Sequence, residues 1–541
     1  MTNKDLQLLE EIVNTDIPNL IPKFMNEAFN NGTREIEHPL DCTVTEKLKE
    51  ISSKMRDEDD DYRIFCFADD IKDIWKLVIQ KSIKCLRYFD TREPYIEYPS
   101  KHPVAYGVEE LSDYFDKYIS FESMLYGGGK YYRDHVIHVF RVWLLGLQCL
   151  LDDDGKYLKK IEIQRDVEIN CFEKISIWSM IALTHDLGYP LEKAQGIIDR
   201  TKDMMKCFIS NPTVSMDLSF NGIQTNMNDF VVRFISSKMI EVNNKCPKEE
   251  CDEIERRYVA RIQPKYYNKF QKSLERYNHG ILSAIILYKL LRYFLESDFN
   301  INEDYQFGQE EARQFYIHRE ILRAVASHTC RDIYHLDMLS FSFLLIVVDD
   351  AQEWGRKRIS ELYVNKDSSY EFCSIVPSFD VHESQHRDET IKIHSFKAKE
   401  KFSFKNESDL RDTFLSLYKQ CRGYKEIFRD GQDTIRRNFN FEKQCDISFE
   451  NTKSVNFVVQ LIISYDDRPR FTITVSGDTP RALNKFGVKY FEEIFKPYMV
   501  EKLESSSKEY SGCLFITSNS SGVSFRGAFN ISSGIFVFPI S

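Results

Sequence analysis

Apolar positions recur three and four residues apart through most of the first two thirds of the chain. This spacing predicts helices, because it gathers apolar side chains on one face of a 3.6-residue turn. The pattern begins with a helix at Leu6 to Val13 and a second through Ile71 to Ile79. Between about 111 and 362 it is almost entirely helical, and is clearest at Val136 to Leu151, Ile175 to Leu183, Ile281 to Leu295, Ile321 to Ala326 and Leu339 to Val348. We therefore predict a helical N-terminal region over 1–110, followed by a helical bundle over 111–362.

The pattern changes to that of strands after about residue 369. Thr390 to Phe396 and Phe457 to Ser464 are rich in β-branched and aromatic residues, and Phe471 to Val475 alternates with period two. Both features are typical of strands. The last third therefore contains a sheet.

A helix is predicted between these strands and the three strand-like segments that end the chain. Thr479 and Pro480 offer an N-cap followed by proline at the first helical position, and an amphipathic pattern runs from Leu483 to Leu503. We predict a separate α+β domain over 375–541. The fold class is then mainly α, with this α+β domain at its C-terminal end.

The composition of the chain limits the partners and the cellular location that we expect for the protein. The net charge of -11 argues against a sequence-independent grip on a nucleic-acid backbone, and we expect no stable nucleic-acid binding. The longest strongly apolar stretch, Phe341 to Val348, is far shorter than the ~20 residues that cross a bilayer. The 13 cysteines form no CxxC pair, and no N-terminal apolar run precedes Lys4. These features predict a cytoplasmic protein with reduced thiols and no membrane segment.

Ionisable residues interrupt the apolar helical stretches at separated places. A histidine buried beside an aspartate costs several kcal/mol unless each has a partner, and a divalent cation satisfies both. The adjacent pair His185 and Asp186 stands in such a setting, within Ile181 to Pro190. The other members in chain order are His138, His279, His328 and Asp349. Each alone is more often structural, because a single core histidine usually satisfies itself with one hydrogen bond. Their occurrence together indicates a metal site.

The segment before the first histidine adds candidates for binding an anion. His135 and His138 are three residues apart, which places both on one helix face, so one could bind metal while the other faces substrate. Gly127 to Lys130 is a flexible lead-in whose amides and lysine could approach a phosphate. The same segment is explained equally well as a plain surface turn without a ligand.

The order His, His-Asp, His, His, Asp on helices resembles the HD-domain superfamily of metal-dependent phosphohydrolases, over residues 111–362. His138 matches the first ligand of that family, because His138 to Val142 reproduces its His-x-x-x-Val spacing. Asp349 matches the last ligand better than Asp350. Gly188-Tyr189-Pro190 follows the His-Asp pair, but the paired histidines of the cyclic-dinucleotide subgroup with that tripeptide are missing. The first histidine motif also differs in spacing from that of eukaryotic cyclic-nucleotide phosphodiesterases.

The resemblance implies roles for the candidate residues. The metal ligands are His138, His185, Asp186 and Asp349. The catalytic residues are His135, Arg133 and Asp186. The residues that bind substrate phosphate are Lys130, His279, His328 and Arg331, with Arg356 and Arg358 as anion candidates or surface charges. His279 and His328 could instead complete a second metal position. Mixed imidazole and carboxylate ligands favour a divalent transition metal, Mn, Fe, Co, Ni or Zn, with Mg as a further ion.

Among the activities of this superfamily, we favour hydrolysis of deoxynucleoside triphosphates to nucleoside and tripolyphosphate. A large helical core with flanking domains is similar to the oligomeric, ligand-regulated triphosphohydrolases, and a role in nucleotide depletion during phage defence is compatible with that resemblance. The expected partners are a nucleotide substrate, a nucleotide regulator and further copies of the chain. One alternative is a phosphodiesterase for a cyclic nucleotide or oligonucleotide second messenger. Another is a nucleotide sensor without catalysis.

Overall fold

A computed structural model divides the chain into two compact units, residues 1–333 with 339–360 and residues 334–338 with 361–541. In the first unit the structure describes residues 4–14, 39–55, 67–86, 108–128, 134–161, 163, 167, 169–210, 223–242, 256–295, 301, 305–330, 332–333 and 339–352. In the second it describes 369–378, 393–404, 438–449, 453–463, 470–477, 511–518, 524–530 and 535–537.

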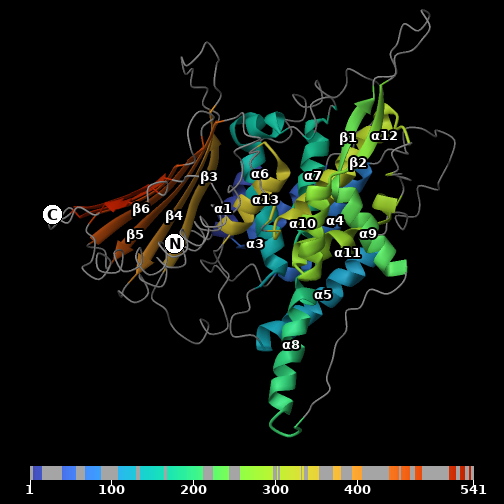
Figure 1. The fold of residues 1–541 in the computed structure, drawn as a ribbon, viewed down its shortest axis with the longest axis horizontal. Helices are drawn as coiled ribbons and strands as arrows, with labels where there is room; N and C mark the ends of the chain where they lie inside the picture. The colour runs from blue at the N-terminus through green and yellow to red at the C-terminus, as the bar shows by residue number, and fades with distance from the viewer. Residues whose placement is uncertain are drawn as a thin grey trace, which may run out of the picture. The chain divides into compact units, whose positions relative to one another are not determined.

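The described part of the first unit is mainly helical, as predicted (Figure 1). Its helices are α1 (Lys4–Asn14), α3 (Cys42–Met55), α4 (Ala68–Leu86), α5 (Val108–Gly128), α6 (Val136–Lys160), α7 (Cys171–Thr184), α8 (Tyr189–Met205), α9 (Ile223–Ser236), α10 (Pro264–Glu275), α11 (His279–Leu290), α12 (Gln309–Ser327) and α13 (Phe341–Ala351), with a 3-10 turn at Arg292–Leu295. Gly127 and Gly128 lie at the end of α5, which corrects the prediction that they belong to a flexible lead-in.

Helix α7 is the centre of this unit. Every residue from Cys171 to Thr184 is buried, as expected for a helix that is apolar on all sides. Its first turn has a capping box, in which Asn170 and Glu173 each bond the other's backbone. Trp75 of α4 donates its indole N–H to the carbonyl of Leu183, over 2.8 Å. The core thus fixes the end of α7, which precedes the His-Asp pair.

Helices α6 and α7 approach closely at a glycine. A Cβ at Gly146 would lie 1.8 Å from the ring of Trp178, so the tryptophan occupies the space of a missing side chain. The indole of Trp178 donates to the carbonyl of Trp143, and the indole of Trp143 donates to Ser179. These contacts fix α6, which contains His138 and has His135 as its N-cap, against α7.

The predicted N-terminal region contributes to the same core. Leu8, Leu9 and Ile12 of α1 are buried, and Trp75 of α4 stacks on Phe115 of α5 with ring centroids 4.3 Å apart. The division at residue 110 stays a prediction, since no observation separates the two regions.

Between residues 111 and 362 the structure contains a two-stranded antiparallel sheet that the sequence pattern did not predict. Strands β1 (Ser237–Val242) and β2 (Arg257–Ile262) pair from Ser237 with Ile262 to Val242 with Arg257. Each strand has six residues, too few for a period of two to stand out between helices.

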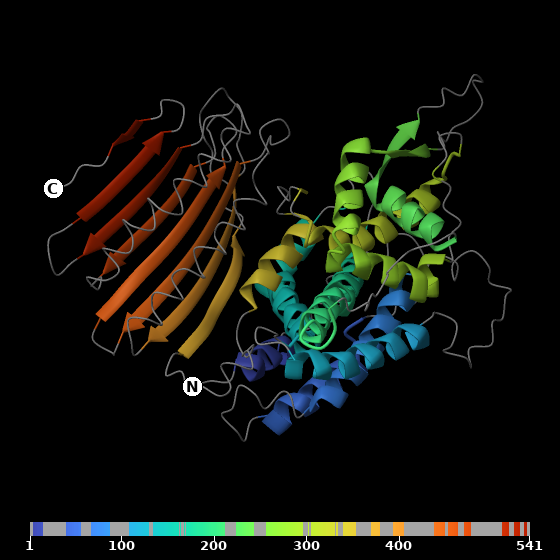
Figure 2. The same ribbon diagram turned by 60° about the horizontal axis from the view of Figure 1, so that its bottom comes forward.

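The described residues of the second unit form one eight-stranded sheet, seen most openly in Figure 2. In chain order its strands are β3 (Ser369–Ser378), β4 (Ile393–Phe404), β5 (Asn438–Phe449), β6 (Lys453–Ile463), β7 (Arg470–Gly477), β8 (Ser511–Ser518), β9 (Ser524–Asn530) and β10 (Ile535–Val537). Spatial order follows chain order. Pairs β4–β5 and β7–β8 are parallel, and the other pairs are antiparallel.

The predicted strands of the C-terminal region fall in β4, β6 and β7. The predicted helix from Leu483 to Leu503, with Thr479 and Pro480 before it, lies outside the described residues.

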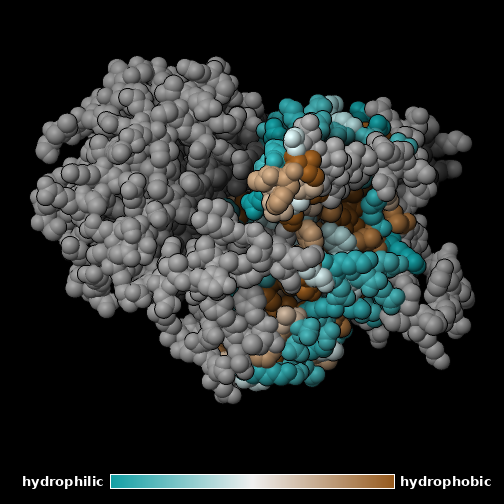
Figure 3. All heavy atoms as spheres, turned by 90° about the horizontal axis from the view of Figure 1, so that it is seen from below, coloured by the Kyte–Doolittle hydropathy of each residue, from teal (hydrophilic) through white to brown (hydrophobic). Residues whose placement is uncertain are grey.

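The C-terminal half of α8 extends away from the other helices of its unit (Figure 1). Its exposed apolar side chains include Ile197, Met204, Phe208 and Ile209, the last two just beyond the helix. Seen from this end, hydrophobic residues interrupt the hydrophilic surface of the described part (Figure 3). No described helix combines the length and apolar character needed to cross a membrane.

A buried histidine outside the candidate site makes stability depend on pH. His318 of α12 packs against Tyr293 and Phe294 and is bonded by Gln314, and burial lowers its pKa from 6.5 to about 3. The unfolded chain therefore binds the proton first as pH falls, so stability declines below about pH 6.5. We expect the contribution of His318 to be about 2 kcal/mol smaller at pH 5 than at pH 8. Urea unfolding of wild type and His318→Gln at both pH values tests this. An equal loss in the two proteins would contradict it.

Candidate metal centre

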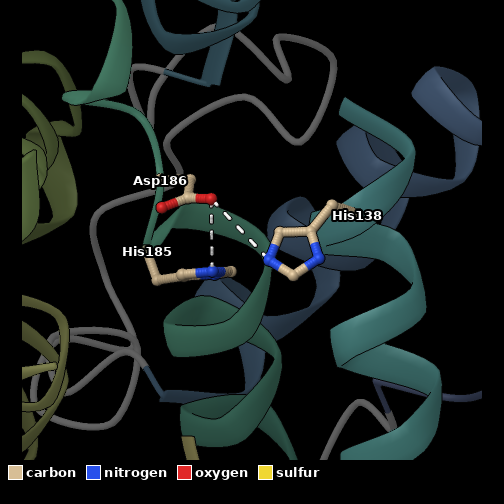
Figure 4. Close-up of side chains that lie close together, drawn as sticks. All are labelled: His138, His185 and Asp186. Atoms are coloured by element: carbon tan, nitrogen blue, oxygen red, sulfur yellow. Dashed lines mark ion pairs between the residues drawn. The ribbon is translucent and has the colours of Figure 1, made fainter. Parts of the chain in front are cut away.

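Residues from five separated parts of the first unit meet at one place. His135 and His138 lie at the start of α6, the pair His185 and Asp186 follows α7, His279 begins α11, His328 follows α12, and Asp349 lies in the last turn of α13. Figure 4 shows the rings of His138 and His185 beside the carboxylate of Asp186. The sequence-predicted ligands are thus close in space.

The backbone after α7 turns His185 and Asp186 towards the same point. His185 is the C-cap of α7, and the amide of Tyr189 bonds the carbonyl of Asp186 over 2.9 Å, closing a turn. A Cβ at Gly188 would lie 2.4 Å from the carbonyl oxygen of His279. The amide of Gly188 also donates to Ser283, over 2.7 Å. The absence of a side chain at Gly188 therefore lets this turn rest directly on the start of α11.

Two histidines that cap helices are oriented by their own helix. Nδ1 of His185 is 2.8 Å from the carbonyl oxygen of Ala182, and Nδ1 of His328 is 2.6 Å from that of Val325. A carbonyl only accepts, so each Nδ1 carries a proton and each Nε2 is the ring atom left to bind a metal. Both Nε2 atoms are buried, and within the described part of the chain neither forms a hydrogen bond.

Two further histidines are oriented by side chains. Nδ1 of His279 lies 2.7 Å from Oε2 of Glu192, and Nδ1 of His138 bonds Oε1 of Gln352. Metal-binding histidines commonly donate their second N–H to such a carboxylate, carbonyl or amide oxygen. All four imidazoles thus direct Nε2 into the cluster.

The two oxygens of Asp186 face different pairs of histidines. Oδ2 lies 3.5 Å from Nε2 of His185 and 3.8 Å from Nε2 of His138. Oδ1 lies 3.3 Å from Nε2 of His279 and 3.7 Å from Nε2 of His328. Asp186 therefore stands between two pairs of imidazoles, with one oxygen towards each.

Asp349 completes the side of His138 and His185. Its Oδ1 is 2.8 Å from Nε2 of His138 and 3.8 Å from Nε2 of His185. Both ring nitrogens of His138 thus face acceptors, since Gln352 bonds the other. An imidazole satisfies two acceptors only as a cation, and a metal ion can take the place of the proton shared with Asp349.

These groups could hold a divalent metal ion. Three overlapping triads have ligand atoms within 4.8 Å of one another: His138, His185 and Asp186; His185, His328 and Asp349; and Asp186, His279 and His328. Two ligands about 2.1 Å from a tetrahedral ion lie about 3.4 Å apart, close to the separations around Asp186. The buried Nε2 atoms of His185 and His328 form no hydrogen bond to a described residue, and leaving such atoms unsatisfied costs about 1–3 kcal/mol each.

The charges of the cluster are interdependent. Burial opposes ionisation of Asp186 and Asp349, but the surrounding histidines hold both pKa values well below the usual range. Burial also disfavours a charged His185, yet the two carboxylates outweigh it and raise its pKa to about 9. For His328 burial dominates and lowers the pKa. Both carboxylates are thus anionic at neutral pH, as metal ligands must be.

His135 contacts the cluster in a different way. Its Nδ1 is 2.9 Å from Oδ2 of Asp186, and its ring lies on that of Tyr189 with centroids 3.7 Å apart. Its backbone amide donates to the buried carboxylate of Glu122, over 2.6 Å. His135 therefore borders the metal-ligand atoms, where a proton donor or substrate contact would stand.

The structure does not describe every predicted residue. Lys130, Arg133, Arg331, Arg356 and Arg358 lie outside the described residues. Three residues near the cluster were not predicted from the sequence: Glu192 and Gln352, which orient histidine rings, and Glu122, which accepts from the backbone amide of His135. An acidic residue in the first turn of α8 was the available signal for Glu192, whereas Gln352 resembles any polar helix end.

Comparison of the chain with protein-family models, curated proteins and solved structures found no match. Function is therefore inferred from the residues of the site.

Proposed function

We propose that the protein is a metal-dependent phosphohydrolase. The observation that carries this proposal is the convergence of four Nε2 atoms, from His138, His185, His279 and His328, on the carboxylate of Asp186. Mixed imidazole and carboxylate donors suit Mn, Fe, Co, Ni or Zn, whereas Mg prefers oxygen alone. The order of these residues also resembles that of the HD-domain superfamily.

Asp186 is suited to serve two metal positions. One would be held by His138, His185 and Asp349 and the other by His279 and His328, with Asp186 between the two sets. Ions in such centres activate water as a nucleophile and neutralise charge on phosphoryl oxygens. His279 and His328 could instead contact phosphate directly. In either arrangement these six side chains would hold the reacting groups beside one another.

His135 is the proposed proton-transfer residue. Its contact with Asp186 orients the imidazole, and Tyr189 packs on the ring face. A histidine held at the border of the metal ligands can give a proton to the departing oxygen. Arg133, Lys130 and Arg331 remain proposed phosphate contacts on sequence grounds.

As substrate we propose a deoxynucleoside triphosphate, hydrolysed to nucleoside and tripolyphosphate. The support is the resemblance to oligomeric triphosphohydrolases that combine a helical core with added domains. In this proposal the C-terminal unit binds a regulatory nucleotide or joins copies of the chain, and the activity contributes to nucleotide depletion in antiphage defence.

The test is metal analysis of the purified protein followed by a substrate screen. Deoxynucleoside triphosphates, nucleoside triphosphates and cyclic nucleotides are each incubated with Mn²⁺, Co²⁺ or Mg²⁺, and the products are separated. We expect bound transition metal and release of tripolyphosphate. A nucleoside monophosphate formed from a cyclic substrate would instead identify a phosphodiesterase. Bound nucleotide without turnover would identify a sensor, and a protein without metal would refute the proposed centre.

A further inference from the structure

Lys193 lies beside the candidate centre and has no role in the proposal above. It follows Glu192 in the first turn of α8, and its side chain is 39% exposed. Its Nζ is 2.6 Å from Oε1 of Glu192 and 4.7 Å from the centroid of the Tyr189 ring. The ammonium group is thus reachable from solvent and held by two neighbours.

One chain of contacts joins Lys193 to the metal ligands through Glu192. The other oxygen of that carboxylate, Oε2, accepts from the backbone amide of His279 over 2.9 Å and lies 2.7 Å from its Nδ1. Nε2 of His279 lies 3.3 Å from Oδ1 of Asp186. Lys193 is therefore two side chains removed from the carboxylate at the centre of the cluster.

A second chain of contacts leads to the same carboxylate through aromatic rings. The ring of Tyr189 is in contact with Lys193 and packs on His135, whose Nδ1 bonds Oδ2 of Asp186. The two chains of contacts leave opposite oxygens of Asp186 and meet at Lys193. This places the lysine on the side of the cluster where His135 and His279 lie.

The cluster carries several negative charges that repel a phosphate. Asp186 and Asp349 lie beside its histidines, and Glu192 bonds His279. Among the described residues, Lys193 is a lysine in contact with this group. Because the proposed substrate is a polyanion, we propose that Lys193 binds its phosphate chain at the border of the metal centre. This inference rests on the proposed function.

The present contacts of Lys193 allow it to change partner. A partly exposed ion pair contributes little to stability, so moving Nζ from Glu192 to a phosphate oxygen is readily reversible. Glu192 bonds His279 through Oε2 and Lys193 through Oε1. His279 can therefore keep its orientation when the lysine moves.

The test compares Lys193→Gln with Lys206→Gln. Lys206 lies just after α8, is paired with Asp203 over 2.7 Å, and has a 62% exposed side chain, so it is a matched lysine away from the centre. The dissociation constant of inorganic tripolyphosphate is measured by calorimetry, with and without Mn²⁺, together with bound metal. We expect binding weakened about 10- to 100-fold in Lys193→Gln, an effect of less than about twofold in Lys206→Gln, and unchanged metal content in both. Lys193→Arg should restore part of the affinity.

Equal tripolyphosphate affinity in wild type and Lys193→Gln, or no binding by wild type, would overturn the role of Lys193. Loss of metal from Lys193→Gln would also overturn it, by showing that the lysine acts on the ligands. Failure of the proposed function has a different result, a wild-type protein that holds no metal. Because the anion is also titrated without Mn²⁺, the comparison decides about Lys193 in that case too.

Discussion

Asp186→Asn should lose metal and hydrolytic activity together. The substitution keeps the shape of the side chain and removes the charge that faces both pairs of histidines, over 3.3 to 3.8 Å. A neutral amide oxygen is a poor ligand for a transition metal, and its NH₂ group would meet Nε2 lone pairs or His135. If the metal contributes several kcal/mol to the transition state, the rate should fall on the order of 10³-fold or more. Metal content and initial rates with the best substrate of the screen measure both effects.

Asp350→Asn is the matched control for this variant. Asp350 follows Asp349 in α13 and is also only partly exposed, but its carboxylate belongs to none of the three triads. We expect Asp350→Asn to keep its metal and to retain activity close to that of wild type. Equal metal content and rates in Asp186→Asn and wild type would show that the activity arises elsewhere. Loss of both in Asp350→Asn would mean that the last ligand is off by one residue.

The closeness of the candidate ligands in space could be predicted from the sequence, because each ligand is a polar residue in or beside an apolar helix. His279 begins an apolar helix and His328 ends one, so both stand where helix ends enter the core. His185 and Asp186 follow a helix that is buried on all sides. Charged groups are rarely left in such places without partners, and their order along the chain matched a known arrangement.

The residues that orient the ligands could not be predicted in this way. Glu192 and Gln352 belong to helix ends where polar residues are common, and each reaches a histidine from a distant part of the chain. Their function depends on how α8 meets α11 and how α13 meets α6. One sequence contains no periodicity that reports such contacts. The pairing of β1 with β2 could not be predicted for the same reason, because it also depends on a contact between separate segments of the chain.

Removing the buried carboxylate of Asp5 should destabilise the first unit strongly. Asp5 of α1 and Arg141 of α6 are fully buried and form a two-pronged ion pair, with Nε to Oδ1 at 2.8 Å and an Nη to Oδ2 at 2.7 Å. In Asp5→Ala the guanidinium stays buried without this carboxylate, which typically costs about 3–5 kcal/mol. Urea unfolding followed by circular dichroism measures the change in unfolding free energy.

The double variant Asp5→Leu with Arg141→Met distinguishes the contribution of the ion pair to stability from that of the packing of α1. It replaces both charges with apolar groups of similar length, and such exchanges are often neutral or stabilising. We expect it to be more stable than Asp5→Ala. Arg141 lies one turn after His138 on α6, so a double variant that folds and still binds metal would show that the pair fixes α1 rather than the ligands. A loss below about 1 kcal/mol in Asp5→Ala would instead mean that the guanidinium finds water or another acceptor once α1 loosens.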